Sequence, residues 1–284
     1  MRRGERRSSW FEINTKTLNT LGRLRIMKNL YFQCAARSVL GLVRSGNEDS
    51  ALIGSQVIAV ADGMGGHAGG EVASSVAINT LAEISPTFLS PEMDSDSVSD
   101  LYLNSLHTID SQIRAVASDD PALSGMGTTL TSLFISGSEI SLLHIGDSRA
   151  YRLRGNSLDQ LSADHTVLQE LLNKGVISES EAQVHPQRSM LTQALMGEGT
   201  LEPSLHIFEG KVQDRYILCS DGLSGVLTLK EIKTLIKGKS AADAVDALID
   251  ATYINGAPDN VTIVIADIVE ESSTQVEKLG AAKA

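Results

Sequence analysis

The chain has 284 residues, of which 42% are hydrophobic and 21% charged, which is enough apolar material for one large domain or two small ones. Its formal net charge is −11 and its pI is about 5.0. This balance argues against a nucleic-acid-binding protein, because such proteins carry a basic face.

The first 28 residues differ in composition from the rest of the chain. They hold eight Lys/Arg against two Glu, a net charge of +6, so the other residues carry 16 basic and 33 acidic groups, a net of −17. We predict that residues 1–28 form a disordered basic extension. The alternatives are a basic arm that binds acidic lipid or a partner, and a natural start near Met27. A single domain is predicted at residues 29–270, followed by a polar, loose tail at residues 271–284.

Two features suggest a cytoplasmic protein without a membrane span. Cys34 and Cys219 lie far apart in separate apolar runs, so no zinc spacing or disulfide framework can be built from them and both are expected to be reduced. The longest apolar run, residues 261–269, is too short for a bilayer, and the chain shows no signal-peptide core.

Apolar patterning predicts the following elements in chain order. The first half is expected to form strands at 31–43 and 51–61, a helix at 69–84, a loop at 85–100, a helix at 101–117 and strands at 128–136 and 140–145. The second half is expected to form a strand at 150–153, helices at 164–174 and 178–184, strands at 205–209 and 216–220, helices at 229–236 and 240–254 and a strand at 261–269. Strict strand–helix alternation is absent, which favours an α+β fold with antiparallel sheets.

Carboxylates recur where these strands begin or end, mostly beside a glycine. The positions are Asp62, Asp147, Asp221, Asp259 and the loop pair Glu48 and Asp49. Strands fix the backbone, so such side chains would form a dense negative cluster, which hard cations such as Mg²⁺ or Mn²⁺ would neutralise. Gly63 would let its carbonyl approach an ion closely. Asp-Gly is also a common turn dipeptide, which is the better explanation for any one site, whereas the recurrence favours a metal centre.

Two further segments bear on phosphate chemistry. Arg44 lies within five residues of Asp49, and a guanidinium can hold a phosphate through two parallel hydrogen bonds, although a lone arginine is more often a surface ion-pair partner. The glycine-rich run at residues 62–70 lacks the Lys-Ser/Thr of a P-loop and the spacing of a dinucleotide fingerprint. We exclude both of those nucleotide-binding motifs.

Six motifs resemble, in the expected order, those of the type 2C metal-dependent serine/threonine protein phosphatases. They are residues 44–49 (RSGNED), 62–70 (DGMGGHAGG), 127–129 (GTT), 146–149 (GDSR), 220–222 (SDG) and 259–262 (DNVT). The match covers about residues 31 to 269 and is most similar to the bacterial branch that opposes Hanks-type kinases, particularly its actinobacterial members. The resemblance implies an αββα four-layer sandwich, two antiparallel sheets flanked by helices.

The same resemblance implies a binuclear Mn²⁺ or Mg²⁺ centre. Asp62 would bridge the two ions, the Gly63 carbonyl would bind one of them, and Arg44 would hold the substrate phosphate. The other implied ligands are Asp221 and Asp259 on the second ion, Glu48 and Asp49 through metal-bound water, and Asp147 with Asp221 at a third, weaker site. An irregular flap, residues 163–195, is implied to border the site and to influence substrate choice.

The implied mechanism is in-line attack on phosphorus by metal-activated water, without a phosphoenzyme. Ser148 is therefore interpreted as a turn residue. Met64 stands where animal members carry a histidine that protonates the leaving alkoxide; bacterial relatives share the methionine, so activity is expected with an unknown proton donor. His67 is the nearest alternative in sequence, although it could equally pack against or cap the following helix, and His165 and His185 are weaker ones.

We therefore predict an enzyme that hydrolyses phosphoserine and phosphothreonine in proteins. It is expected to act as a monomer on phosphorylated proteins that include a serine/threonine kinase. Two alternatives stay open. One is a pseudophosphatase that keeps the fold as a binding module, which the presence of every expected ligand aspartate disfavours. The other is a metal-dependent phosphohydrolase of small molecules.

Overall fold

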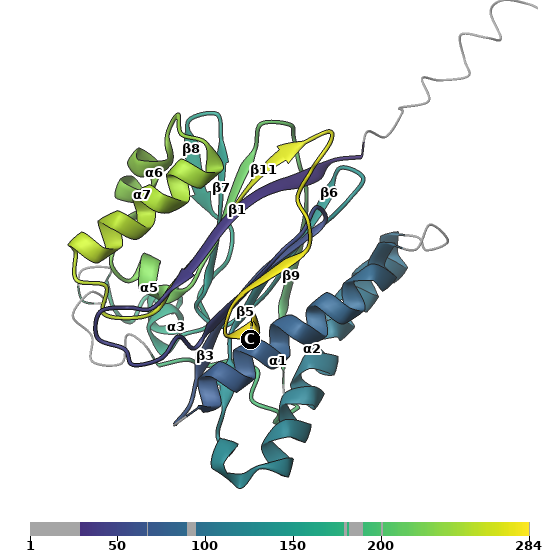
Figure 1. Ribbon diagram of the computed structural model, residues 1–284, viewed down its shortest axis with the longest axis vertical. Coiled ribbons are helices and arrows are strands. Elements are labelled where there is room, and N and C mark those ends of the chain that lie inside the picture. Colours follow the sequence, from purple (N-terminus) through teal and green to yellow (C-terminus); the bar gives the residue numbers. More distant parts are fainter. Residues whose placement is uncertain are drawn as a thin grey trace, which may run out of the picture.

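The structure, a computed structural model, describes residues 29–66, 68–89, 95–178, 181, 190–199 and 201–283. Two antiparallel β-sheets are stacked face to face, and helices cover the outer face of each (Figure 1). This arrangement confirms the predicted α+β fold and its αββα layers. The basic extension, His67, His185 and most of the helix predicted at residues 178–184 lie outside the described residues.

The first sheet pairs a strand from the start of the domain with a strand from near its end. Its order is β1–β11–β10–β7–β8, and the strands are β1 (Tyr31–Val39), β7 (Arg149–Arg154), β8 (Ser157–Gln160), β10 (Arg215–Cys219) and β11 (Val261–Val269). β1 pairs with β11 along its whole length, from Tyr31 opposite Val269 to Val39 opposite Val261. The short β8 was not predicted from the sequence.

The second sheet carries the hairpin that positions two of the predicted site residues. Its order is β12–β2–β3–β5–β6–β9, with β4 beside β3. The strands are β2 (Asp49–Ile53), β3 (Val57–Met64), β4 (Gly127–Thr128), β5 (Leu130–Ser136), β6 (Glu139–Ile145), β9 (Ser204–Glu209) and β12 (Glu277–Gly280). The single strand predicted at residues 51–61 is therefore wrong, because residues 54–56 turn the chain back. The resulting register places Asp49 opposite Asp62.

Two pairs of helices cover the sheets. α1 (Gly69–Ile84) and α2 (Ser95–Asp119) pack on the second sheet, whereas α6 (Leu229–Ile236) and α7 (Ala241–Ile254) lie on the first sheet, at the left in Figure 1. Short helices α3 (Val167–Asn173) and α5 (Asp221–Ser224) lie near the junctions of strands. Within the described ranges, no helix is both long enough and apolar enough to cross a membrane.

α2 begins before the predicted position, so the loop predicted at residues 85–100 is wrong in its last part. Its polar first turn, which contains Ser and Asp, resembles a loop in composition. The buried side chains nevertheless recur at helical spacing, and they are Val98, Tyr102, Leu106, Ile109 and Ile113. Residues 85–89 form a 3₁₀ turn before the helix.

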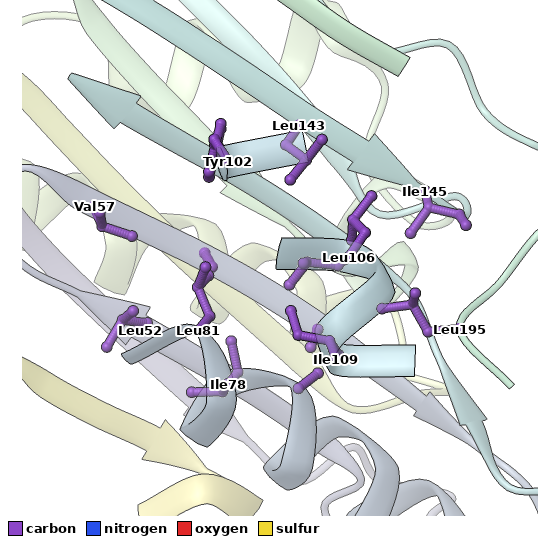
Figure 2. Close-up of a cluster of buried hydrophobic side chains, with 14 of the residues drawn as sticks. Leu52, Val57, Ile78, Leu81, Tyr102, Leu106, Ile109, Leu143, Ile145 and Leu195 are labelled. Carbon is purple, nitrogen blue, oxygen red and sulfur yellow. The ribbon is translucent and has the colours of Figure 1, made fainter. Parts of the chain in front are cut away.

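Three apolar layers hold the sandwich together, because each strand of a doubly covered sheet faces two cores. Along β3, Val57 and Ala59 face the core under α1 and α2, whereas Ile58 and Val60 face the core between the sheets. A third core lies between the first sheet and the helices α5, α6 and α7. Figure 2 shows the α1–α2 core, where Leu106 and Ile109 lie among side chains from the second sheet and α1.

Residues 277–283 form a strand and a 3₁₀ turn, although the sequence predicted a loose tail. β12 adds to the edge of the second sheet beside β2, and the next turn buries Ala282. Gly280 has φ +67°, and a Cβ there would lie 2.1 Å from the Asp49 carbonyl oxygen, so this position needs glycine. The tail has few apolar residues, which is why its composition suggests a loose segment.

Candidate metal centre

The predicted carboxylates gather at one end of the stacked sheets. Asp62 lies near the end of β3, Asp147 in the turn between β6 and β7, Asp221 at the first position of α5 and Asp259 just before β11. They open onto a cavity of about 530 Å³. It is lined by Arg44, Glu48, Asp62, Gly63, Met64, Gly65, Thr129, Asp147, Leu191, Thr192, Gln193, Ala194, Met196, Asp221 and Asp259. Every predicted site residue except Asp49 therefore faces this one cavity.

Close backbone contacts explain the glycines beside these aspartates. A Cβ on Gly222 would lie 1.9 Å from the carbonyl oxygen of Asn260, and a Cβ on Gly63 would lie 2.0 Å from the carbonyl oxygen of Gly70. Both distances are far below van der Waals contact, so each position needs a residue without a side chain. Gly222 thereby lets the start of α5 approach the segment before β11, which brings Asp221 and Asp259 to the same cavity.

Asp49 lies behind the cavity. Its side chain is 1% exposed, and its Oδ2 accepts a hydrogen bond from Ser220 Oγ at 2.8 Å. Ser220 Oγ in turn accepts from the backbone N–H of Thr262. Asp49 thus joins the start of β2 to the loop that carries Asp221, and it supports the cavity from beneath.

The backbone of Asp62 is fixed by two threonines to which the sequence reasoning gave no role. Thr128 Oγ1 and the N–H of Thr129 both donate to the Asp62 carbonyl oxygen at 2.9 Å. The N–H of Asp62 donates to Thr129 Oγ1 at 3.0 Å. Thr129 Oγ1 also lies 2.8 Å from the hydroxyl of Ser148, which is fully buried, as expected for a turn residue rather than a nucleophile. The GTT motif at residues 127–129 was the sequence signal that could have indicated a role for these threonines.

Burial and mutual repulsion make the carboxylates hard to ionise. Burial, followed by the nearby charges of Asp49, Asp221 and Asp147, raises the pKa of Asp62 well above its ordinary value. Burial and the charge of Asp221 raise the pKa of Asp147 to about 7. Burial likewise raises the pKa of Asp49 to about 7 and that of Asp221. Divalent cations would relieve this repulsion, and an all-oxygen donor set is the one that Mg²⁺ and Mn²⁺ prefer.

The arrangement is open rather than a closed metal cage. In the described part of the chain, no three His, Cys, Asp or Glu side chains are already grouped so that they could hold one ion. Mg²⁺ keeps several waters and binds through one or two carboxylates. Carboxylates spread around a cavity therefore fit hydrated hard cations better than a closed structural zinc site.

Arg44 lies at the edge of the cavity and is held by one of the carboxylates. Its Nη2 donates to Asp259 Oδ2 at 2.6 Å, with 47% of the arginine side chain exposed. The hydrogen bond to Asp259 raises the pKa of Arg44 further above its ordinary value. Arg44 is thus both an ion-pair partner and a cavity residue, and it places a permanent positive charge beside the acidic residues of the lining.

No histidine of the described residues lines the cavity. Met64 lines the cavity, and a thioether cannot donate a proton. His165 lies outside the lining, and its Nδ1 accepts a hydrogen bond from the N–H of Gly146 at 3.2 Å. Burial lowers the pKa of His165, and its hydrogen bond with Gly146 supports the turn that carries Asp147.

Part of the predicted flap lines the same cavity as the carboxylates. α3 lies within the helix predicted at residues 164–174. Residues 191–194 line the cavity, where the N–H of Thr192 donates to the carbonyl of His165 at 2.9 Å and Leu195 pairs with Thr128. The sequence reasoning predicted the flap but none of its lining side chains. None of the lining residues 191–194 is of a type that points to chemistry.

The family profile described as Protein phosphatase 2C matches residues 47–258. The chain belongs to this family. The resemblance inferred from the six motifs is therefore confirmed, and the carboxylate cavity lies where those motifs meet.

The relatives include bacterial serine/threonine protein phosphatases. The serine/threonine protein phosphatase PstP of Mycobacterium tuberculosis is 42% identical over 253 residues, which cover 88% of this chain and 48% of that protein. The chain thus spans about half the length of this relative. The serine/threonine phosphatase stp of Listeria welshimeri is 32% identical over 239 residues, covering 81% of this chain and 94% of that protein.

Solved structures of protein phosphatase 2C relatives share the fold. A crystal structure of the M. tuberculosis phosphatase PstP/Ppp superposes with a TM-score of 0.78 at 43% identity, covering 84% of this chain and 98% of that one. The PstP catalytic domain in complex with two manganese ions gives a TM-score of 0.76 at 41% identity, covering 84% and 99%.

Proposed function

We propose that this chain is a metal-dependent protein phosphatase that hydrolyses phosphoserine and phosphothreonine in proteins. The observation that carries the proposal is the convergence of five acidic side chains and Arg44 on one cavity in a chain of the protein phosphatase 2C family. No expected carboxylate is missing from the fold, which favours an active enzyme over a binding module.

We propose that the cavity holds two Mn²⁺ or Mg²⁺ ions and binds a third at a weaker site. The related PstP catalytic domain was solved with two manganese ions. Asp62, Asp221 and Asp259 would hold the two main ions with the Gly63 carbonyl, and Asp147 with Asp221 would hold a third. Glu48 would act at the edge of the cavity, and Asp49 would act from behind it. When bound, such ions supply a water of lowered pKa and neutralise phosphoryl oxygens.

The remaining chemistry falls to the chain itself. Arg44 would bind the substrate phosphate, with its guanidinium aligned by Asp259 at 2.6 Å. Thr128 and Thr129 hold the Asp62 backbone so that its carboxylate does not reorganise during the reaction. No side-chain nucleophile is needed, since the buried Ser148 hydroxyl is already bonded to Thr129.

The physiological setting is part of the proposal. We propose that the substrates are phosphorylated proteins, including a serine/threonine kinase, and that the chain acts as a monomer in the cytoplasm. The finding behind the location is that no membrane-crossing helix occurs among the described residues.

The function is tested by adding Mn²⁺, Mg²⁺ or EDTA to the purified chain with p-nitrophenyl phosphate, a phosphothreonine peptide and a nucleotide as substrates. We expect hydrolysis that requires Mn²⁺ or Mg²⁺, stops with EDTA and favours the peptide over the nucleotide. Absence of turnover by a folded protein would support the binding-module alternative. A preference for the nucleotide would support a small-molecule phosphohydrolase.

A further inference from the structure

The cavity lining contains two chemically unlike groups of side chains. One group comprises Arg44 and the acidic residues. The other group, which we call the uncharged wall, comprises Met64, Leu191, Thr192, Gln193, Ala194 and Met196. A phosphate drawn to Arg44 and to cations among the acidic residues would therefore bring the rest of its carrier molecule close to side chains that hold no charge.

Two apolar side chains of the uncharged wall, Met64 and Met196, lie close to Gly127. A Cβ on Gly127 would lie 2.9 Å from Met196 Cγ and 3.1 Å from Met64 Cε. The glycine thus leaves room for both thioether side chains to lie close to the β4 backbone. Met196 is 39% exposed, so part of this residue is accessible to a bound molecule. Methionine adapts its shape to apolar partners.

Met196 is fixed by its neighbours on both sides. Leu195 exchanges two backbone hydrogen bonds with Thr128, at 2.9 and 3.0 Å. On the other side, the carboxylate of Asp110 accepts hydrogen bonds from the N–H groups of Gly197 at 2.7 Å and Gly199 at 2.9 Å.

The second anchor comes from α2, on the outer layer of the molecule. Asp110 is 2% exposed, and a buried carboxylate that accepts two backbone N–H bonds is a strong, directional contact. Arg114, one turn further along α2, donates from Nε to the Gly197 carbonyl. Gly197 and Gly199 have φ of +76° and +78°, a conformation that favours glycine. This turn therefore presents Met196 to the cavity in one position.

We propose that the uncharged wall, held in place by Asp110, selects phosphopeptides with an apolar residue next to the phosphorylated one. The inference rests on the proposed phosphatase function. Asp110 touches neither phosphate nor cation, so it is a positioning residue. The apolar neighbour of the phosphoresidue would pack on Met196 while the phosphate lies by Arg44 in the same cavity.

The test compares two phosphothreonine peptides that differ only in the residues flanking the phosphothreonine, Leu in one and Gln in the other. With Mn²⁺, we expect the wild type to show about a tenfold higher kcat/KM for the Leu peptide, since partial burial of a leucine side chain gives an advantage of this size. In Met196→Ala the ratio should fall to about twofold, because most of the contact surface is gone.

Asp110→Ala and Arg114→Ala test the anchor. Both should lower the Leu-to-Gln ratio, Asp110→Ala more, and amide hydrogen exchange at Gly197 and Gly199 should become faster. Asp119→Ala, an exposed change near the end of the same helix, should keep the wild-type ratio. Should Asp110→Ala fail to fold, as judged by circular dichroism, the milder Arg114→Ala decides the role of the anchor.

The outcomes separate this inference from the proposed function. Equal kcat/KM for the two peptides in the wild type, or an unchanged ratio in Met196→Ala, would overturn the wall as a selector while leaving the phosphatase activity in place. Unchanged ratio and hydrogen exchange in both anchor variants would overturn the role of Asp110. A wild type that hydrolyses neither peptide nor p-nitrophenyl phosphate would instead overturn the function itself.

Discussion

Two groups of cavity residues are held in different ways. Asp62, Asp221 and Asp259 each lie within two residues of a strand end, where sheet hydrogen bonds fix the backbone. Residues 191–196, which supply most of the uncharged wall, belong to no long strand or helix and are held by isolated contacts from β4 and α2. The three aspartates are thus fixed by regular structure, whereas residues 191–196 depend on a few specific contacts.

This difference separates the residues that would bind the cations from the residues that would select the substrate. A ligand set for cations must hold its geometry closely, and strand ends provide that. A surface that meets varied protein substrates gains from being adjustable by single substitutions far from the metal centre. The predictions that follow probe this contrast, beginning with the largest effect.

Asp62→Asn should have the largest effect, because it removes a charged ligand from the centre of the cluster. We expect kcat/KM to fall by at least about a hundredfold. The metal-free protein should become more stable to urea, since a buried carboxylate that its neighbours repel is replaced by a neutral amide. Asp250→Asn, exposed on α7, is the control. Undiminished turnover in Asp62→Asn would contradict the assignment.

Gly222→Ala should show that the placement of the aspartates depends on a backbone contact. The new methyl group would collide with the Asn260 carbonyl, so Asp221 and Asp259 would move apart. We expect kcat/KM to fall by about tenfold to a hundredfold, the size of effect that a 1 Å displacement produces, and Mn²⁺ binding measured by calorimetry to weaken. Gly66→Ala, where a Cβ meets nothing within 4 Å, is the matched control and should bind Mn²⁺ like the wild type.

Arg44→Ala tests a cavity residue that lies in a loop. Loss of the guanidinium should raise KM for p-nitrophenyl phosphate by about tenfold, the cost of one charge-assisted contact. Arg37→Ala removes an exposed arginine that pairs with Asp246 at 3.4 Å, and it should leave KM unchanged. A large loss of kcat at constant KM would show that Arg44 acts mainly in the transition state.

His144→Gln tests the smallest effect, at a contact between β6 and the first residue of the flap. His144 Nε2 lies 3.0 Å from the carbonyl of Ala163, and burial lowers its pKa to about 3. Between pH 6.5 and 3 the unfolded chain therefore binds a proton that the folded chain does not, so stability falls as pH falls. From pH 6.5 to 5.5 we expect the wild type to lose about 1 kcal/mol more than the variant in urea unfolding. Parallel losses would exclude a neutral buried His144.

The sequence predicted the acidic residues of the cavity well because their signals are local. Each aspartate sits beside an apolar run, and a glycine marks each close backbone approach. The fold class followed from the same runs, although residues 54–56 were too weak a turn signal to divide β2 from β3. The burial of Asp49 could not be predicted, because it depends on Ser220, which lies 171 positions away.

The uncharged wall was missed for the opposite reason. Its side chains are ordinary, and its anchor, Asp110, lies 87 positions before Gly197. An aspartate on a helix is most often a solvated surface residue, and α2 carries others that are exposed. Distinguishing Asp110 required the packing of α2 on the second sheet. Similarly, the strand at residues 277–280 depends on the free edge of β2 rather than on its own composition.

The pairing of β1 with β11 has a consequence for how the protein is made. The first strand stays without its partner until residues 261–269 have left the ribosome, and Arg44 meets Asp259 only at that stage. Long-range pairing of this kind also slows folding. An incomplete nascent chain therefore cannot assemble the cavity, and synthesis yields no catalytically competent fragment before the domain is nearly finished.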